Sequence, residues 1–278
     1  MDITIFRQKD IFPSFVADKL ASSPIDYKEK YQETKYFSHQ AKPRLAAGVV
    51  LLLHYKQFSP DHSEYAFQLI KRSDKISQGG DISCPGGMLN PVFDKAISFF
   101  LKAGFFPSLH KQISLATTGK DKEEINLINL FLINALREAW EEIGLNPFRV
   151  SFLGALPCYS LIVASRTIFP LVCLVPEPFK FELSAEVEKI IEIPVSTFFN
   201  SSKYALLDVE MPFSSIISNR QFPCLTLTVD EGEQEILWGA TFNIIMNFLR
   251  IISNEDLPIP SSCETIKKIL SKNYISRK

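Results

Sequence analysis

The stretch from Ala135 to Leu145, ALREAWEEIGL, decides the fold of this chain. Its Ala, Leu, Arg and Glu residues are good helix formers, and Gly144 stands where a helix commonly ends in a left-handed residue. Spacings of three and four residues place three carboxylates on one face of such a helix: Glu138, Glu141 and Glu142. That face is either solvated and balanced by Arg137, or gathered around a divalent cation, which takes oxygen ligands. The apolar residues on the other side and a Gly-rich turn upstream favour the cation.

The upstream turn has the sequence CPGG and ends in Gly86 and Gly87. Glycines adopt backbone angles that other residues avoid, and such a turn offers amide and carbonyl groups to a ligand. In isolation the turn is an ordinary tight turn. Beside an acidic helix it predicts a substrate-binding role for Gly86 and Gly87.

Two segments resemble the halves of the Nudix box, G-x5-E-x7-R-E-U-x-E-E-x-G-U, in which U is a bulky aliphatic residue. REAWEEIGL resembles the second half, and CPGGMLNPVFD resembles the first half with Gly87 as the box glycine. Arg137 follows Gly87 by 50 positions, which is about 36 more than the pattern requires. The acidic residue of the first half is Asp94, one position later than in the pattern. The resemblance implies a Nudix hydrolase with a long insertion inside the box.

The fold class that we predict is α/β, a Nudix-like α/β/α sandwich with a mixed sheet and a helical insertion. Apolar strand runs alternate with amphipathic helices from Arg44 onward, which is typical of such layers. We expect strands at 44–55, 65–71, 152–157, 167–175, 179–183 and 225–229. We expect helices at 94–104, 122–143, 195–199, 238–252 and 261–272, with a loop at 105–121.

The predicted domain organisation has three parts. Residues 1–42 form an N-terminal helix and linker, or part of a homodimer contact. Residues 43–255 form the Nudix hydrolase domain, with the insertion at about 95–130, and residues 256–278 end the chain in a helix.

Composition narrows the choice of partners. The 278 residues carry 30 basic and 31 acidic side chains, so bulk charge gives no sign of a nucleic-acid surface. Five scattered cysteines without a CxxC motif indicate reduced thiols in a cytoplasmic protein. The first residues lack the continuous apolar core of a signal peptide, and the longest apolar runs are too short to span a bilayer. We therefore expect a small-molecule partner and neither nucleic acid nor membrane.

Further segments resemble one Nudix subgroup, the coenzyme A (CoA) pyrophosphatases. The segments 69–73 and 80–87 are similar to its LLTxRS…GxxxFPGG pattern. The chain departs from that pattern in three ways. The spacing is one residue short, Cys84 replaces Phe, and the arginine expected between the segments is missing, with Lys75 the nearest basic residue. Two downstream segments are similar to the subgroup's EV…EVPL and IWGxT stretches: 186–195 and 236–241.

The resemblance implies that Mg²⁺ or Mn²⁺ neutralises a pyrophosphate and activates a water molecule. The implied metal ligands are Glu138, Glu141, Glu142 and Gly87. The implied catalytic residues are Glu141, Glu142, Glu186 and Arg137, with Glu186 as the general base and Glu188 as the second candidate. Arg137 orients a glutamate through a charge-assisted hydrogen bond. The implied substrate-binding residues are Arg72, Lys71, Gly86 and Gly87. For Glu186, Glu188, Arg72 and Lys71, a solvated surface role remains the alternative.

Three functions follow from this pattern. The first is hydrolysis of CoA or acyl-CoA to 3′,5′-ADP and (acyl-)4′-phosphopantetheine. The second is the same reaction on ADP-ribose, NADH or another nucleotide sugar or dinucleotide. The third is a nucleotide-binding Nudix module without activity, against which the three clustered glutamates argue.

Overall fold

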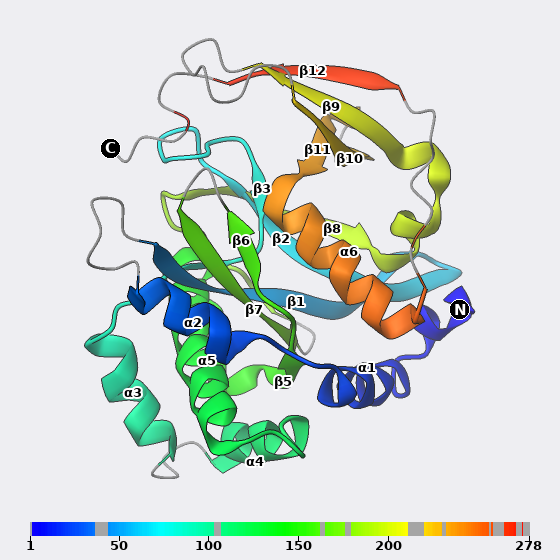
Figure 1. Ribbon diagram of the computed structural model, residues 1–278. Helices are drawn as coiled ribbons and strands as arrows, with labels where there is room; N and C mark the ends of the chain where they lie inside the picture. The colour runs from blue at the N-terminus through cyan, green and yellow to red at the C-terminus, as the bar shows by residue number, and fades with distance from the viewer. Residues whose placement is uncertain are drawn as a thin grey trace.

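The computed structural model describes residues 2–36, 44–102, 107–161, 165–175, 179–210, 220–229, 232–255, 257, 264–270 and 274. Within these residues the chain forms two sheets, with helices around the larger one (Figure 1).

The larger sheet has eight described strands in the order β3-β2-β1-β7-β5, with β4 beside β1, β6 beside β7 and β8 beside β2. The long central strand β1 pairs in parallel with β7 and antiparallel with β2, so the sheet is mixed, as predicted. The strands are β1 (Leu45–Ser59), β2 (His62–Arg72), β3 (Ile82–Ser83), β4 (Gly86–Met88), β5 (Ser151–Ala155), β6 (Tyr159–Leu161), β7 (Arg166–Leu174) and β8 (Val187–Pro194).

Both faces of this sheet are apolar, because side chains alternate along a strand. Val50 and Leu52 of β1 pack in one core with helices α2 (Tyr27–Tyr36), α4 (Pro107–Ala116) and α5 (Lys122–Ile143). Leu51 and Leu53 pack in the other core with α1 (Phe12–Ser22) and α6 (Gly239–Ser253). The predicted α/β/α sandwich is therefore confirmed.

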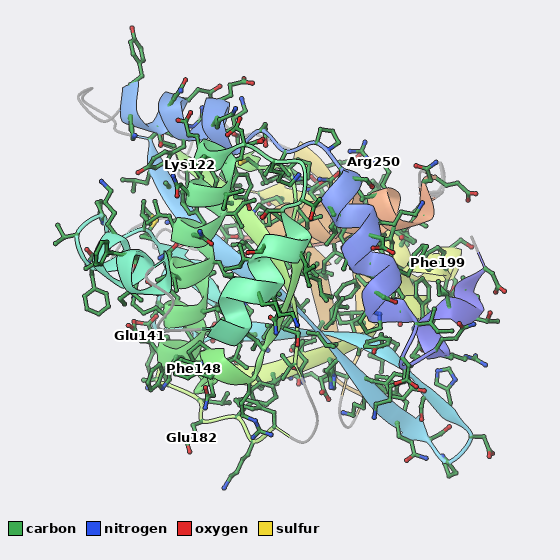
Figure 2. All side chains as sticks on the ribbon, turned by 90° about the horizontal axis from the view of Figure 1, so that it is seen from below. Lys122, Glu141, Phe148, Glu182, Phe199 and Arg250 are labelled. Carbon is green, nitrogen blue, oxygen red and sulfur yellow. The ribbon has the colours of Figure 1, made fainter. Side chains whose placement is uncertain are left out.

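Helix α5 carries the acidic box residues and has well-defined ends. Asp121 and Glu124 form a capping box at its start, which satisfies amide groups that lack partners within the helix. Gly144 ends the helix with a φ of 69°, the left-handed cap that the sequence predicted. Figure 2 shows Lys122 and Glu141 near opposite ends of this helix.

The second sheet has the strand order β11-β10-β9-β12 and was predicted only at 225–229. Its strands are β9 (Tyr204–Glu210), β10 (Arg220–Thr228), β11 (Gln234–Trp238) and β12 (Thr265–Ile269). The predicted helix at 261–272 is wrong, because its described part contains β12. That strand pairs in parallel with β9, and its residues alternate between exposed and half-buried. The hydrogen bonds to β9 therefore decide its conformation, although the spacing of its apolar residues suggested a helix. Residues 261–263 and 271–272 of the predicted helix lie outside the described residues.

Other segments also differ from the prediction. Helix α4 lies in the expected loop at 105–121, and residues 179–183 form no strand. Helix α2 lies where we expected a polar linker, and the predicted helix at 195–199 is a 3-10 helix. None of the described helices combines the length and hydropathy needed to cross a membrane.

The N-terminal residues are part of the core. Phe12, Val16 and Leu20 of α1 are fully buried, and the hydroxyl of Tyr27 donates to the carbonyl oxygen of Pro170 at 2.7 Å. The segment that we predicted to be separate thus covers both faces of the larger sheet. The division into three parts stays a prediction.

Candidate active site

The C-terminal half of α5 lies against the Gly86–Gly87 turn of β4. The Gly86 amide donates to Oε2 of Glu142 at 2.9 Å. A Cβ atom placed on Gly87 would lie 2.3 Å from Oε2 of Glu138, so that carboxylate rests directly on the glycine backbone. Two of the three predicted carboxylates and both predicted glycines therefore meet at one place.

The third carboxylate, that of Glu141, is turned outward. Its side chain is 61% exposed and accepts hydrogen bonds from Nη1 of Arg137 at 3.1 Å (Figure 2). Arg137 also donates to Glu138 at 2.7 Å and to Asp94 at 2.9 Å. Asp94 is fully buried, so the displaced acid of the first box half is the internal partner of the box arginine. Burial alone would lower the pKa of Arg137, but its bonds to Asp94 and Glu141 raise it.

Burial raises the pKa of Glu142 to about 7, although the Gly86 amide and the charge of Arg72 act in the opposite direction. The charges of Glu138 and Glu186 add to the rise. Burial also raises the pKa of Glu138, against the opposing effect of Arg137. Two carboxylates that are costly to ionise side by side fit a bound divalent cation, whose charge would offset their repulsion. Within the described part of the chain, no three His, Cys, Asp or Glu side chains are already grouped closely enough to hold a metal.

The raised pKa of Glu142 predicts how stability changes with pH. The folded protein retains the Glu142 proton up to about pH 7, whereas the unfolded chain loses it near pH 4.5. The free energy of unfolding of the metal-free protein should therefore fall as pH rises through this window and level off above it. Thermal unfolding in a metal chelator should show a decrease on the order of 5 °C, and Glu142→Gln should make this decrease smaller, leaving the part due to Glu138. An equal decrease in that variant would contradict the assignment.

A loop that contacts the end of α5 carries Glu186 close to Glu142. The amides of Glu182 and Ser184 donate to the carbonyl oxygens of Ile143 and Glu142 at 3.0 and 2.9 Å, which caps the end of α5. The carbonyl oxygen of Glu186 accepts from the Ser73 amide at 2.8 Å, just after β2. The second candidate base, Glu188, forms an ion pair with Lys71 at 3.1 Å. The ion pair of Glu188 with Lys71 therefore favours Glu186 as the candidate for the general base.

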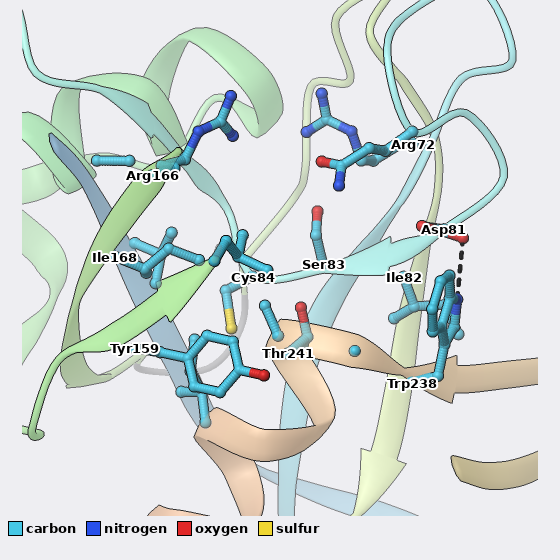
Figure 3. Close-up of a pocket in the computed structure, with 18 of the residues that line it drawn as sticks. Arg72, Asp81, Ile82, Ser83, Cys84, Tyr159, Arg166, Ile168, Trp238 and Thr241 are labelled. Carbon is cyan, nitrogen blue, oxygen red and sulfur yellow. Dashed lines mark hydrogen bonds between the residues drawn. The ribbon is translucent and has the colours of Figure 1, made fainter. Parts of the chain in front are cut away.

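Gly86 and Gly87 are among the residues that line a cavity of about 250 Å³. Figure 3 shows this cavity with other residues of its lining. Apolar residues of β1, β7 and α6 form part of its wall, and aromatic residues of the second sheet form another part. Arg72 of β2 and Arg166 of β7 line it from two different strands, and their guanidinium groups project toward the same end. The cavity thus joins a cationic end to an apolar and aromatic interior.

The other predicted basic residue, Lys71, does not line this cavity. Its ammonium group pairs with Glu235 at 2.8 Å and with Glu188 at 3.1 Å, in contacts between β2, β8 and β11. Adjacent residues of a strand point to opposite faces, so Arg72 and Lys71 cannot serve one ligand. The structure separates two residues that the sequence treated as equivalent.

Two site residues escaped the sequence reasoning. Asn134 is fully buried; it accepts from the Gly48 amide at 2.7 Å and donates to the Met88 carbonyl at 3.1 Å. It also donates to Asp94 at 3.2 Å, so it joins α5, β1 and the start of the insertion. A polar residue within the apolar run INLFLINAL was the available signal. Arg166 gave none, because an arginine at the start of a strand is normally solvated.

Comparisons with known proteins add independent observations. No family model matches the chain. The uncharacterized Nudix hydrolase NudL of Pectobacterium atrosepticum is 28% identical over 144 residues, which cover 51% of this chain and 68% of the relative. The protein of the same name from Escherichia coli is 28% identical over 112 residues, covering 40% of this chain and only 53% of the relative.

The chain is thus similar in sequence to Nudix hydrolases over about half of its length. The prediction of an enzyme of this class is confirmed by these relatives, whereas the CoA subgroup stays a prediction. Among solved structures, a C. elegans Ap4A hydrolase has a TM-score of 0.33 at 13% identity and covers 55% of this chain and 81% of its own. A Nudix hydrolase from Alicyclobacillus acidocaldarius has a TM-score of 0.36 at 13% identity, with coverages of 57% and 82%.

Proposed function

We propose that this Nudix hydrolase relative cleaves the pyrophosphate of a nucleoside diphosphate-linked substrate with the help of Mg²⁺ or Mn²⁺, and that the substrate is CoA or acyl-CoA. The products are then 3′,5′-ADP and 4′-phosphopantetheine or its acyl form. One observation carries the proposal: buried carboxylates at a glycine turn adjoin a cavity with two arginines and an apolar interior.

The residue types at the turn suit this chemistry. Glu138, Glu142 and the Gly87 carbonyl would hold the cation, and Glu141 would add its exposed carboxylate. A bound cation neutralises the pyrophosphate and makes an attacking water more acidic. Glu186 accepts the proton of that water, and its charge already acts on Glu142.

Arg137 has a positioning role in this proposal. Its hydrogen bonds to Asp94 and Glu138 fix the carboxylate of Glu138 at the glycine turn. Asp94 is fully buried, so this partner of Arg137 lies inside the protein. A guanidinium with its donors committed to protein carboxylates is better suited to orient a ligand than to bind the substrate.

The cavity interior supports the choice of CoA. Val49, Ile168 and Ile244 offer apolar surface next to the turn, as a pantetheine arm requires. Arg72 and Arg166 offer guanidinium groups, which recognise phosphates in a bidentate manner. A nucleotide sugar would leave the apolar surface without a matching group.

A substrate panel tests this function. Product release would be measured from CoA, acyl-CoA, ADP-ribose, NADH and diadenosine polyphosphates, each with Mg²⁺ and with Mn²⁺. The expected result is the highest kcat/KM for CoA or acyl-CoA and no turnover in a metal chelator. Brisk hydrolysis of ADP-ribose or NADH without CoA cleavage would reject the CoA assignment, and no turnover of any substrate would reject the activity.

Replacement of Arg72 by alanine is expected to raise the KM for CoA more than the KM for dephospho-CoA. The physical reason is that the guanidinium of Arg72 binds the 3′-phosphate, which dephospho-CoA lacks. Loss of a hydrogen bond to a charged group costs about 1.5–3 kcal/mol, or roughly 10- to 100-fold in KM. Steady-state kinetics on both substrates measure the difference. Lys71→Ala is the control, and equal effects of Arg72→Ala on the two substrates would remove Arg72 from this role.

A further inference from the structure

Helix α6 begins at the wall of the cavity. Its first three residues, 239–241, line the cavity, and the residue before them, Trp238, provides no side-chain cap. The first amide groups of a helix have no partners within the helix, and the helix dipole makes this end positive. A helix of 15 residues therefore directs uncapped amide groups and a partial positive charge at the cavity.

Two hydroxyl groups lie in the same space. The Oγ atom of Ser83 is buried and has no hydrogen-bond partner among the described residues. Thr241 is only 7% exposed, and its hydroxyl makes no hydrogen bond within the described part of the chain. Figure 3 shows both hydroxyls directed into the cavity, below Arg72 and Arg166. Buried hydroxyls without partners are costly, so they indicate a polar ligand.

The charges around this space favour an anion. Arg72 and Arg166 line the cavity, whereas Asp81 is its single acidic residue among the described lining residues. The Asp81 carboxylate already accepts from Nε1 of Trp238 at 3.1 Å, from Nζ of Lys268 at 2.7 Å and from the hydroxyl of Tyr274. Its negative charge is therefore directed into the second sheet and is balanced there.

Part of the space lies on the far side of the larger sheet from the glutamate cluster. Gly48 of β1 contacts α5 through Asn134, whereas its neighbours Ala47 and Val49 line the cavity on the α6 side. Thr241 of α6 thus lies across the larger sheet from the glutamates of α5, with the Gly86–Gly87 turn between them. A pyrophosphate held by the glutamates would leave the α6 side of the cavity to another group of the substrate.

We propose that residues 239–241 of α6, Ser83, Arg72 and Arg166 form a phosphate cradle for a phosphomonoester of the substrate, distinct from the pyrophosphate that is cleaved. The ligand class is a nucleotide that carries an additional phosphate on its ribose. The proposal rests on the proposed function for the identity of the cleaved group, and it extends that function by naming the residues that select the substrate.

Binding measurements test the cradle without catalysis. Isothermal titration calorimetry in a metal chelator would compare adenosine 3′,5′-bisphosphate with AMP. Thr241→Val keeps the shape of the side chain and removes the hydroxyl, whereas Thr241→Ser keeps the hydroxyl, so the two variants are matched. Thr241→Val and Ser83→Ala are each expected to weaken bisphosphate binding on the order of tenfold, with AMP affinity unchanged and Thr241→Ser close to wild type.

The outcomes separate the cradle from the proposed function. Equal losses for AMP and the bisphosphate, or no loss for the bisphosphate, would overturn the cradle even if CoA is hydrolysed. A selective loss for the bisphosphate in a protein that hydrolyses no substrate would support the cradle and reject the function. Thermal unfolding of each variant checks that the fold is retained, and Ser83→Ala provides the second test if Thr241→Val fails to fold.

Discussion

Replacing Glu142 by glutamine is expected to lower kcat by at least about 100-fold while the protein remains folded. Glu142 is 6% exposed, and its carboxylate accepts a hydrogen bond from the Gly86 amide and lies within electrostatic reach of Glu138, Glu186 and Arg72. Glutamine keeps the hydrogen bond to Gly86 but removes the charge that a cation needs. The loss should therefore appear in turnover with Mg²⁺ or Mn²⁺ and in metal affinity.

Two other variants complete this test. Glu141→Gln is expected to lower kcat as well, because we propose its carboxylate as a further ligand. Glu182→Gln changes an exposed glutamate that contributes its backbone amide to the same region, so its activity should stay within about twofold of wild type. Full activity in both Glu141→Gln and Glu142→Gln would refute the metal assignment. An unfolded Glu142→Gln protein would instead indicate a structural role.

The two adjacent glycines of the turn should respond to alanine in opposite ways. A Cβ atom on Gly87 would lie 2.3 Å from Oε2 of Glu138, which belongs to a side chain and can shift at a lower cost than backbone atoms. We expect Gly87→Ala to fold, to displace the Glu138 carboxylate and to lose about 100-fold in kcat, since small displacements of catalytic groups have effects of this size. Activity assays and thermal unfolding measure the two parts of this prediction.

Gly86→Ala should lose stability. Its Cβ atom would lie 2.3 Å from the carbonyl oxygen of Gly48 and 2.6 Å from Cα of Val49, so the obstacle is the backbone of the central strand. The φ of Gly86 is 146°, which an alanine rarely adopts. We expect a loss of roughly 3 kcal/mol in the free energy of unfolding, or no folded protein. A stable and active Gly86→Ala protein would contradict the described geometry.

The sequence by itself determined the helices and strands whose capping residues and apolar spacing favour the conformation that they adopt in the folded protein. Helix α5 has its capping residues, its apolar stripe and its left-handed Gly144, and each signal can be read without knowledge of other segments. The apolar runs of β1, β2 and β7 likewise predicted the central strands of the larger sheet. The spacing of Glu138 and Glu142 also placed both carboxylates on one face of the helix, because helical periodicity is local.

Only the tertiary structure decided the elements and sites that depend on distant partners. The segment 265–269 becomes a strand because β9 offers it an edge, and no local signal outweighs such a ladder. Lys71 and Arg72 are adjacent in sequence but reach different ligands, because the sheet directs them to opposite faces. Arg166, Ser83 and the start of α6 come from three separate segments, and they meet at one cavity because α6 packs against the larger sheet.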